Sequence, residues 1–139
     1  MKTAKELYPS HWEQEQNEKW FFGPSNYQPI IDEFGNVLIQ VDDHDYQGDS
    51  RVMYEKDGKY GFLIFGWGSC SGCDSLQACE SIKDVQDLID TLHNGIHWFD
   101  SLDELKLYFK EKDWQLEYAW HAEETKEFIN KVIDYGNNS

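Results

Sequence analysis

Residues 51–65 read RVMYEKDGKYGFLIF, and this stretch decides the fold. Two runs of β-branched and aromatic residues, 51–55 and 60–65, flank a turn that contains Asp57 and Gly58. An Asp-Gly pair between two such runs is a strong hairpin signal, because both turn positions need a positive φ angle. The apolar residues 37–41 predict a further strand upstream. The three segments together predict a three-stranded antiparallel meander.

Downstream of residue 80 the apolar residues recur with the helical period. Ser81 and Ser101 each stand three residues before an acid, a capping box that predicts a helix start at both positions. A third helix is expected over residues 122–135, and Gly136 suits its end. The side chains expected to face the core are Ile82, Val85, Leu88, Ile89, Leu92, Ile96, Leu102, Leu105, Tyr108, Phe109, Phe128, Ile129 and Val132. Strands followed by three packed helices predict an α+β fold, to which the alternating residues 114–120 offer a fourth strand.

The N-terminal part of the chain carries weaker signals. Residues 10–13 form a capping box that predicts a short polar helix toward Lys19. Pro29 predicts an extended stretch, followed by a turn at residues 33–36. We expect a single domain over residues 1–139, because no linker or repeat interrupts the sequence. Residues 1–9 and 137–139 are expected to be frayed ends.

The chain is strongly acidic, with 27 Asp and Glu against 12 Lys and Arg and a formal net charge of −15. Contacts to phosphate need Lys and Arg, so this balance disfavours direct binding to nucleic acid or to anionic lipid. It favours fast encounter with basic surfaces. No apolar run follows the N-terminal lysines, which argues against a secretory signal, and three cysteines fit a reducing compartment. We therefore expect a cytoplasmic protein.

The three cysteines lie close together in a Gly- and Ser-rich loop after an apolar strand. A Cys-x2-Cys turn offers two thiolates to zinc, so Cys70, Cys73, Cys79 and His93 form a candidate zinc site, with His97 as another fourth ligand. The same spacing resembles a thioredoxin redox segment, in which a helix N-terminus activates the first thiol. The third alternative is structural, with the cysteines packed as small apolar side chains in a tight loop.

Acidic residues recur at regular spacing in the predicted helices. Their positions complement the helix dipole, and their number also suggests imitation of a phosphate backbone. Trp98, which we expect to be exposed, would anchor a partner. The predicted partner-binding residues are Asp84, Asp87, Asp90, Trp98, Asp103 and Glu104.

A second acidic group surrounds His44, with Asp42, Asp43, Asp45 and Asp49 nearby. Oxygen ligands of this kind could hold a divalent cation, but the spacing is not that of an EF-hand, so a solvated loop is the expectation. The sequence has no phosphate-binding loop, nucleophile elbow or zinc-protease helix. It therefore predicts no catalytic residue and no enzyme.

The sequence GWGSCSGCD at residues 66–74, with HWFDSLDELKLYF at 97–109 and WHAEETKEFI at 120–129, resembles a group of small acidic proteins encoded by bacteriophages. The resemblance spans roughly residues 45–135. It implies a phage accessory protein that acts in the cytoplasm of a bacterial host. It also suggests the role of small acidic phage proteins that inhibit host nucleases, restriction systems or CRISPR effectors by occupying basic grooves. It carries no functional residue over.

These observations lead to one expected function and two alternatives. The expectation is a non-enzymatic inhibitor that mimics nucleic acid and binds a host protein with a basic surface, without a cofactor. One alternative is a zinc- or thiol-dependent protein centred on the cysteines. The other is a protein that sequesters a small molecule in an aromatic cleft, with a local basic patch formed by Arg51, Lys56 and Lys59.

Overall fold

Four antiparallel strands form one sheet at the centre of the molecule. The strands are β1 (Asn36–Asp42), β2 (Gly48–Lys56), β3 (Lys59–Trp67) and β4 (His97–Phe99), and they lie in chain order. They belong to a computed structural model that describes residues 1–8, 27–44, 48–68, 75–76, 78–79, 81–114 and 122–136. The predicted α+β fold with an antiparallel meander is confirmed.

The hairpin between β2 and β3 is the part of the sheet that the sequence predicts best. Asp57 and Gly58 both have positive φ angles, 52° and 82°, as the two-residue turn requires. The turn sets a register that runs from Lys56 opposite Lys59 to Gly48 opposite Trp67. The hairpin is longer than predicted, because pairing extends beyond the apolar runs in both strands.

The fourth strand is not the one that the sequence offered. Residues 115–120 of that segment lie outside the described residues. Instead, β4 pairs with residues 60–62 of β3 and follows directly on a helix. Three residues are too few to show a strand period, so no sequence pattern predicted β4. The pairing depends on Gly61, where an added Cβ would stand 2.7 Å from the Trp98 ring.

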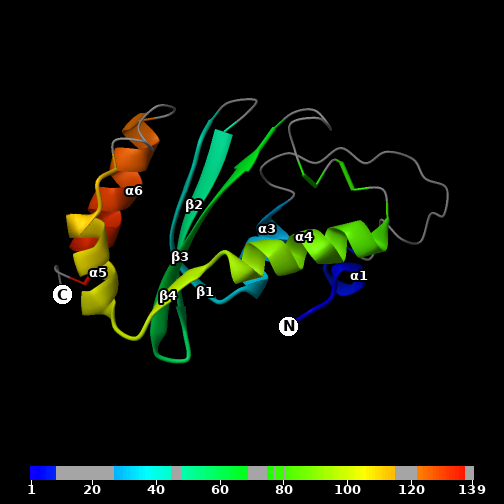
Figure 1. Cartoon of the computed structure of the whole chain (residues 1–139), viewed down its shortest axis with the longest axis horizontal. Helices are drawn as coiled ribbons and strands as arrows, with labels where there is room; N and C mark the ends of the chain where they lie inside the picture. Colours follow the sequence, from blue (N-terminus) through cyan, green and yellow to red (C-terminus); the bar gives the residue numbers. More distant parts are fainter. Residues whose placement is uncertain are drawn as a thin grey trace.

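Helices cover both faces of the sheet (Figure 1). On one face lie α3 (Gln28–Glu33) and α4 (Ile82–Asn94), with α1 (Ala4–Leu7) packed against α4. On the other face lie α5 (Leu102–Glu111) and α6 (Ala122–Asp134). Each face has its own hydrophobic cluster. The first includes Ile30, Ile31, Phe34, Val52, Tyr54, Leu63, Phe65, Trp67, Val85 and Ile89, and the second Val41, Met53, Leu105, Phe109, Phe128, Ile129 and Val132.

The predicted helix boundaries are largely confirmed. The hydroxyls of Ser81 and Ser101 cap α4 and α5 by accepting hydrogen bonds from backbone N–H groups three residues on. Gly136 has a positive φ of 80° just after α6. Two residues of the predicted α4 stripe differ. Ile82 is 39% exposed at the first turn, and Ile96 is buried but follows the end of the helix.

The N-terminal predictions need correction. The stretch after Pro29 is not extended but forms α3, because proline in the first turn of a helix gives up an N–H that has no helical partner. Within residues 1–9, where frayed ends were expected, α1 is capped by Thr3 and buries Ala4. The predicted helix over residues 10–19 and the end at 137–139 lie outside the described residues.

Candidate functional site

The solvent face of α4 carries three of the predicted acids. Asp84, Asp87 and Asp90 are exposed, whereas Val85 and Ile89 on the opposite side of the helix are buried. Gln86 and Lys83 contribute contacts within this face: Gln86 Nε2 donates to Asp90 Oδ1 at 3.1 Å, and Lys83 Nζ donates to Asp87 Oδ2 at 2.8 Å. The bond to Asp87 raises the pKa of Lys83, so this cation stays charged. The face therefore presents three carboxylates and one ammonium.

The six predicted partner-binding residues do not form one surface. Asp103 and Glu104 lie in the first turn of α5, on the opposite face of the sheet from α4 (Figure 1). The chain passes from one face to the other at β4, which separates residues that are close in sequence. Trp98 in β4 is half-buried rather than exposed, because its ring packs over Gly61. The predicted array is thus reduced to the acids of α4.

Among the described residues, the structure does not bring Cys79 and His93 together as zinc ligands. Cys79 precedes α4 and His93 lies in its last turn, and a helix of this length rises roughly 18 Å between its ends. Cys79 Sγ donates to the Ser75 carbonyl at 3.3 Å and packs against the first hydrophobic cluster. No group of three potential metal ligands occurs among the described residues. Cys70 and Cys73 lie outside the described residues, so zinc binding by the cysteine loop stays a prediction.

The thioredoxin alternative does not fit the observed topology. A thioredoxin-like redox motif follows a strand within a βαβ unit, where parallel strands flank a helix. Every strand pair among the described residues is antiparallel, and these strands are neighbours in chain order. The described part of the fold therefore lacks the framework that such a redox site uses.

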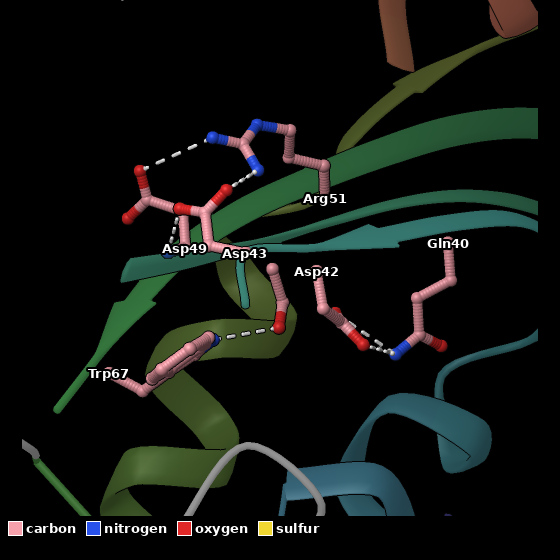
Figure 2. Close-up of polar contacts among 7 residues, drawn as sticks. Gln40, Asp42, Asp43, Asp49, Arg51 and Trp67 are labelled. Carbon is pink, nitrogen blue, oxygen red and sulfur yellow. Dashed lines mark hydrogen bonds and ion pairs between the residues drawn. The ribbon is translucent and has the colours of Figure 1, made fainter. Parts of the chain in front are cut away.

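An arginine pairs with two of the acids on either side of the β1–β2 connection (Figure 2). Arg51 Nη1 lies 2.8 Å from Asp43 Oδ1, and the two side chains are only 2% and 0% exposed. Arg51 Nη2 lies 3.9 Å from Asp49 Oδ2. The second oxygen of Asp43 accepts a 2.7 Å bond from the Asp49 backbone N–H. Two of the carboxylates that we considered for a divalent cation, Asp43 and Asp49, therefore face a guanidinium, and the solvated loop expected from the sequence is wrong for Asp43.

Tight packing fixes this buried ion pair in place. A Cβ added to Gly48 would stand 2.6 Å from the Asp43 Cβ, so only glycine fits there. On the other face of the strand, Trp67 Nε1 donates to Ser50 Oγ at 2.9 Å, also buried (Figure 2). The cluster connects Asp43, which follows β1, to the first residues of β2. Its role is therefore structural.

The opposite end of the hairpin forms an open pocket. Its volume is about 340 Å³, and it is lined by Lys56, Asp57, Lys59, His93 and Trp98. The sequence predicted a basic patch of Arg51, Lys56 and Lys59. Only the two lysines contribute, because Arg51 is buried at the far end of β2. The contribution of α4 and β4 to this pocket had no signal in the sequence, since it depends on how both pack beside the turn.

Comparisons with known proteins do not assign the chain to a family: no family model, curated protein or solved structure matches it. Among the described residues, no helix combines the length and apolar character needed to cross a bilayer.

Proposed function

We propose that the chain is a non-catalytic acidic protein that binds a basic surface of a partner protein, with the solvent face of α4 as its contact surface. The observation that supports the proposal is the exposure of Asp84, Asp87 and Asp90 along one side of a single ordered helix. The formal net charge of −15 adds a long-range attraction to any basic partner.

The spacing of these acids suits a surface that binds nucleic acid. Residues three positions apart on a helix are separated by about 4.5 Å along its axis. A DNA strand presents one phosphate per roughly 3.4 Å of helix axis, so the carboxylates and the phosphates have similar spacings along their axes. A rigid helix also loses little conformational entropy on binding. The spacing and rigidity of α4 therefore support mimicry of a phosphate backbone.

The partner that we propose is a nucleic-acid-acting or defence protein of a bacterial host. Two features support this partner: the resemblance of residues 66–74 to small acidic bacteriophage proteins, and the negative net charge of the chain. Such a partner would have a basic groove for DNA or RNA, and the chain would occupy that groove as an inhibitor in the host cytoplasm.

A charge-matched pair of variants tests the contact surface. Asp84→Asn/Asp87→Asn/Asp90→Asn removes the α4 charges, and Asp103→Asn/Glu104→Gln/Glu111→Gln removes three exposed charges from α5. Each tagged protein would be used to capture basic proteins from a bacterial lysate at low and high salt, followed by displacement with double-stranded DNA. We expect capture by the wild type and the α5 variant, lost with salt or DNA, and much weaker capture by the α4 variant. Equal loss in both variants, or capture that DNA does not displace, would contradict the proposal.

A further inference from the structure

The pocket beside the β2–β3 turn collects positive charge on an acidic protein. Lys56 and Lys59 are directly opposite each other in the hairpin register, so both side chains lie on the sheet face that α4 covers. Like charges at directly opposed positions destabilise an antiparallel pair. Lys59 also lies 3.7 Å from Asp100, but both side chains of that pair are largely exposed, which leaves the interaction weak. The paired lysines are therefore a cost to the hairpin that an anion between them would offset.

The rings of Trp98 and His93 also line the pocket, and packing against neighbouring residues fixes the position of both. The Trp98 ring packs over Gly61 and lies 6.3 Å from the Tyr54 ring. The His93 ring packs against Phe34, with 5.2 Å between the ring centroids. Both side chains also line the pocket, so they offer it ring surfaces in fixed positions. Fixed aromatic surfaces bind planar ligands at a small entropic cost.

We infer that this pocket binds a small ligand in which a planar ring carries an anionic group, as in a nucleoside monophosphate. The ring would stack on Trp98 and His93, and the anion would lie between the ammonium groups of Lys56 and Lys59. A volume of about 340 Å³ suits a ligand of that size, at the lower end of the range for small-molecule pockets. The inference goes beyond the proposed function and is independent of it, because the pocket shares no residue with the acidic face of α4.

Titration calorimetry with three probes tests both parts of the ligand. The probes are adenosine 5′-monophosphate, adenosine and inorganic phosphate, each titrated into the full chain. We expect saturable binding of the monophosphate and at least ~tenfold weaker binding of the other two, since each lacks one of the two contacts. No saturable binding of the monophosphate at millimolar concentration would overturn the inference. Equal affinity for adenosine and its monophosphate would overturn the role of the lysines.

Variants at the turn locate the site without disturbing the core. Lys56→Gln/Lys59→Gln should weaken monophosphate binding ~tenfold or more, while Lys5→Gln/Lys110→Gln, which removes two exposed lysines elsewhere, should not. Asp57→Asn keeps the turn, because asparagine before glycine is favoured there, and it removes a negative charge from the lining of the pocket. This variant should bind more tightly than the wild type. Equal weakening in both lysine variants, or no gain with Asp57→Asn, would contradict the assignment.

Discussion

Strand β2 carries two cationic side chains that differ in burial, Arg51 in its first half and Lys56 at its end. Arg51 is buried on the face covered by α5 and α6, 2.8 Å from Asp43, and it closes a loop. Lys56 is exposed on the other face, opposite Lys59 and beside a pocket. Residue type contributes, because a guanidinium is more weakly hydrated than an ammonium and suits a buried ion pair. The neighbouring segment contributes too, since it supplies a carboxylate to Arg51 and a second ammonium to Lys56.

This comparison separates structural charge from charge available to a ligand. A buried charge needs a partner within the fold, because an unpaired one costs several kcal/mol. An exposed charge is stable in water without a partner, so its presence does not depend on the fold. On this basis Arg51 stabilises the fold, and Lys56 and Lys59 are candidates for contact with other molecules.

The largest expected effect tests the buried end of β2. Arg51→Met should lower the free energy of unfolding by about 3–5 kcal/mol, because the Asp43 carboxylate is left buried without its cation. Lys56→Met, the matched change at the exposed end, should alter it by less than about 0.5 kcal/mol. Urea denaturation followed by circular dichroism measures both. The double variant Asp43→Leu/Arg51→Met should recover part of the loss, and equal stabilities of the two single variants would refute the comparison.

The next effect concerns the loop that holds the pair. Gly48→Ala places a methyl group 2.6 Å from the Asp43 Cβ, so the carboxylate must shift away from Arg51. We expect a loss of about 1–3 kcal/mol, the usual cost of overpacking. Thermal unfolding measures it. A variant as stable as the wild type would show that the loop relaxes without breaking the ion pair.

A smaller effect should appear at alkaline pH and involves Tyr54 of β2. Tyr54 donates a 2.7 Å hydrogen bond to the Ile31 carbonyl, and burial, with a further contribution from Asp32, raises the pKa of its hydroxyl far above the ordinary value. The folded state therefore favours the neutral phenol, and this contribution to stability is present below pH ~10 and declines as the pH rises further, by about 1.4 kcal/mol per pH unit.

Tyr54→Phe separates this contribution from the rest of the alkaline response. The variant should be about 1 kcal/mol less stable than the wild type at pH 7, where it lacks the hydrogen bond. It has no phenol to titrate, so the difference should shrink above pH ~10. Denaturation curves at pH 7 and at several alkaline values measure it, and a constant difference would mean that Tyr54 ionises as readily in the folded state as in the unfolded state.

The smallest effect belongs to the turn. Lys59→Gln breaks the exposed pair with Asp100, and we expect a change in unfolding free energy below about 0.5 kcal/mol. The same variant should nevertheless weaken monophosphate binding to the pocket. A large loss of stability would place Lys59 with Arg51, among the structural charges.

The sequence predicted those features that depend on local chemistry. The Asp57-Gly58 turn fixed the hairpin, and Ser81 and Ser101 marked the starts of two helices, since turn and cap preferences act within a few residues. The extended stretch predicted from Pro29 was wrong because proline suits the first turn of a helix as well as an extended chain. β4 was missed because three residues show no period.

The candidate site was harder to predict because it depends on packing between distant segments. Asp84 and Asp103 have similar sequence surroundings, yet they lie on opposite faces of the sheet, because the chain changes face at β4. Whether Arg51 is exposed or buried depends on the position of Asp43, eight residues away in another segment. The pocket combines the hairpin turn with residues from α4 and β4, and no local pattern links them.

The alternation of side chains along β2 has a consequence for how the protein unfolds. Val52 and Tyr54 belong to one hydrophobic cluster, and Met53 between them belongs to the other. The central strands therefore contribute side chains to both hydrophobic clusters. If the helices on one face of the sheet detach, the apolar side chains of that face become exposed to water and the strands lose support for the other cluster. Loss of one layer should thus bring loss of the other, in a single cooperative melting transition.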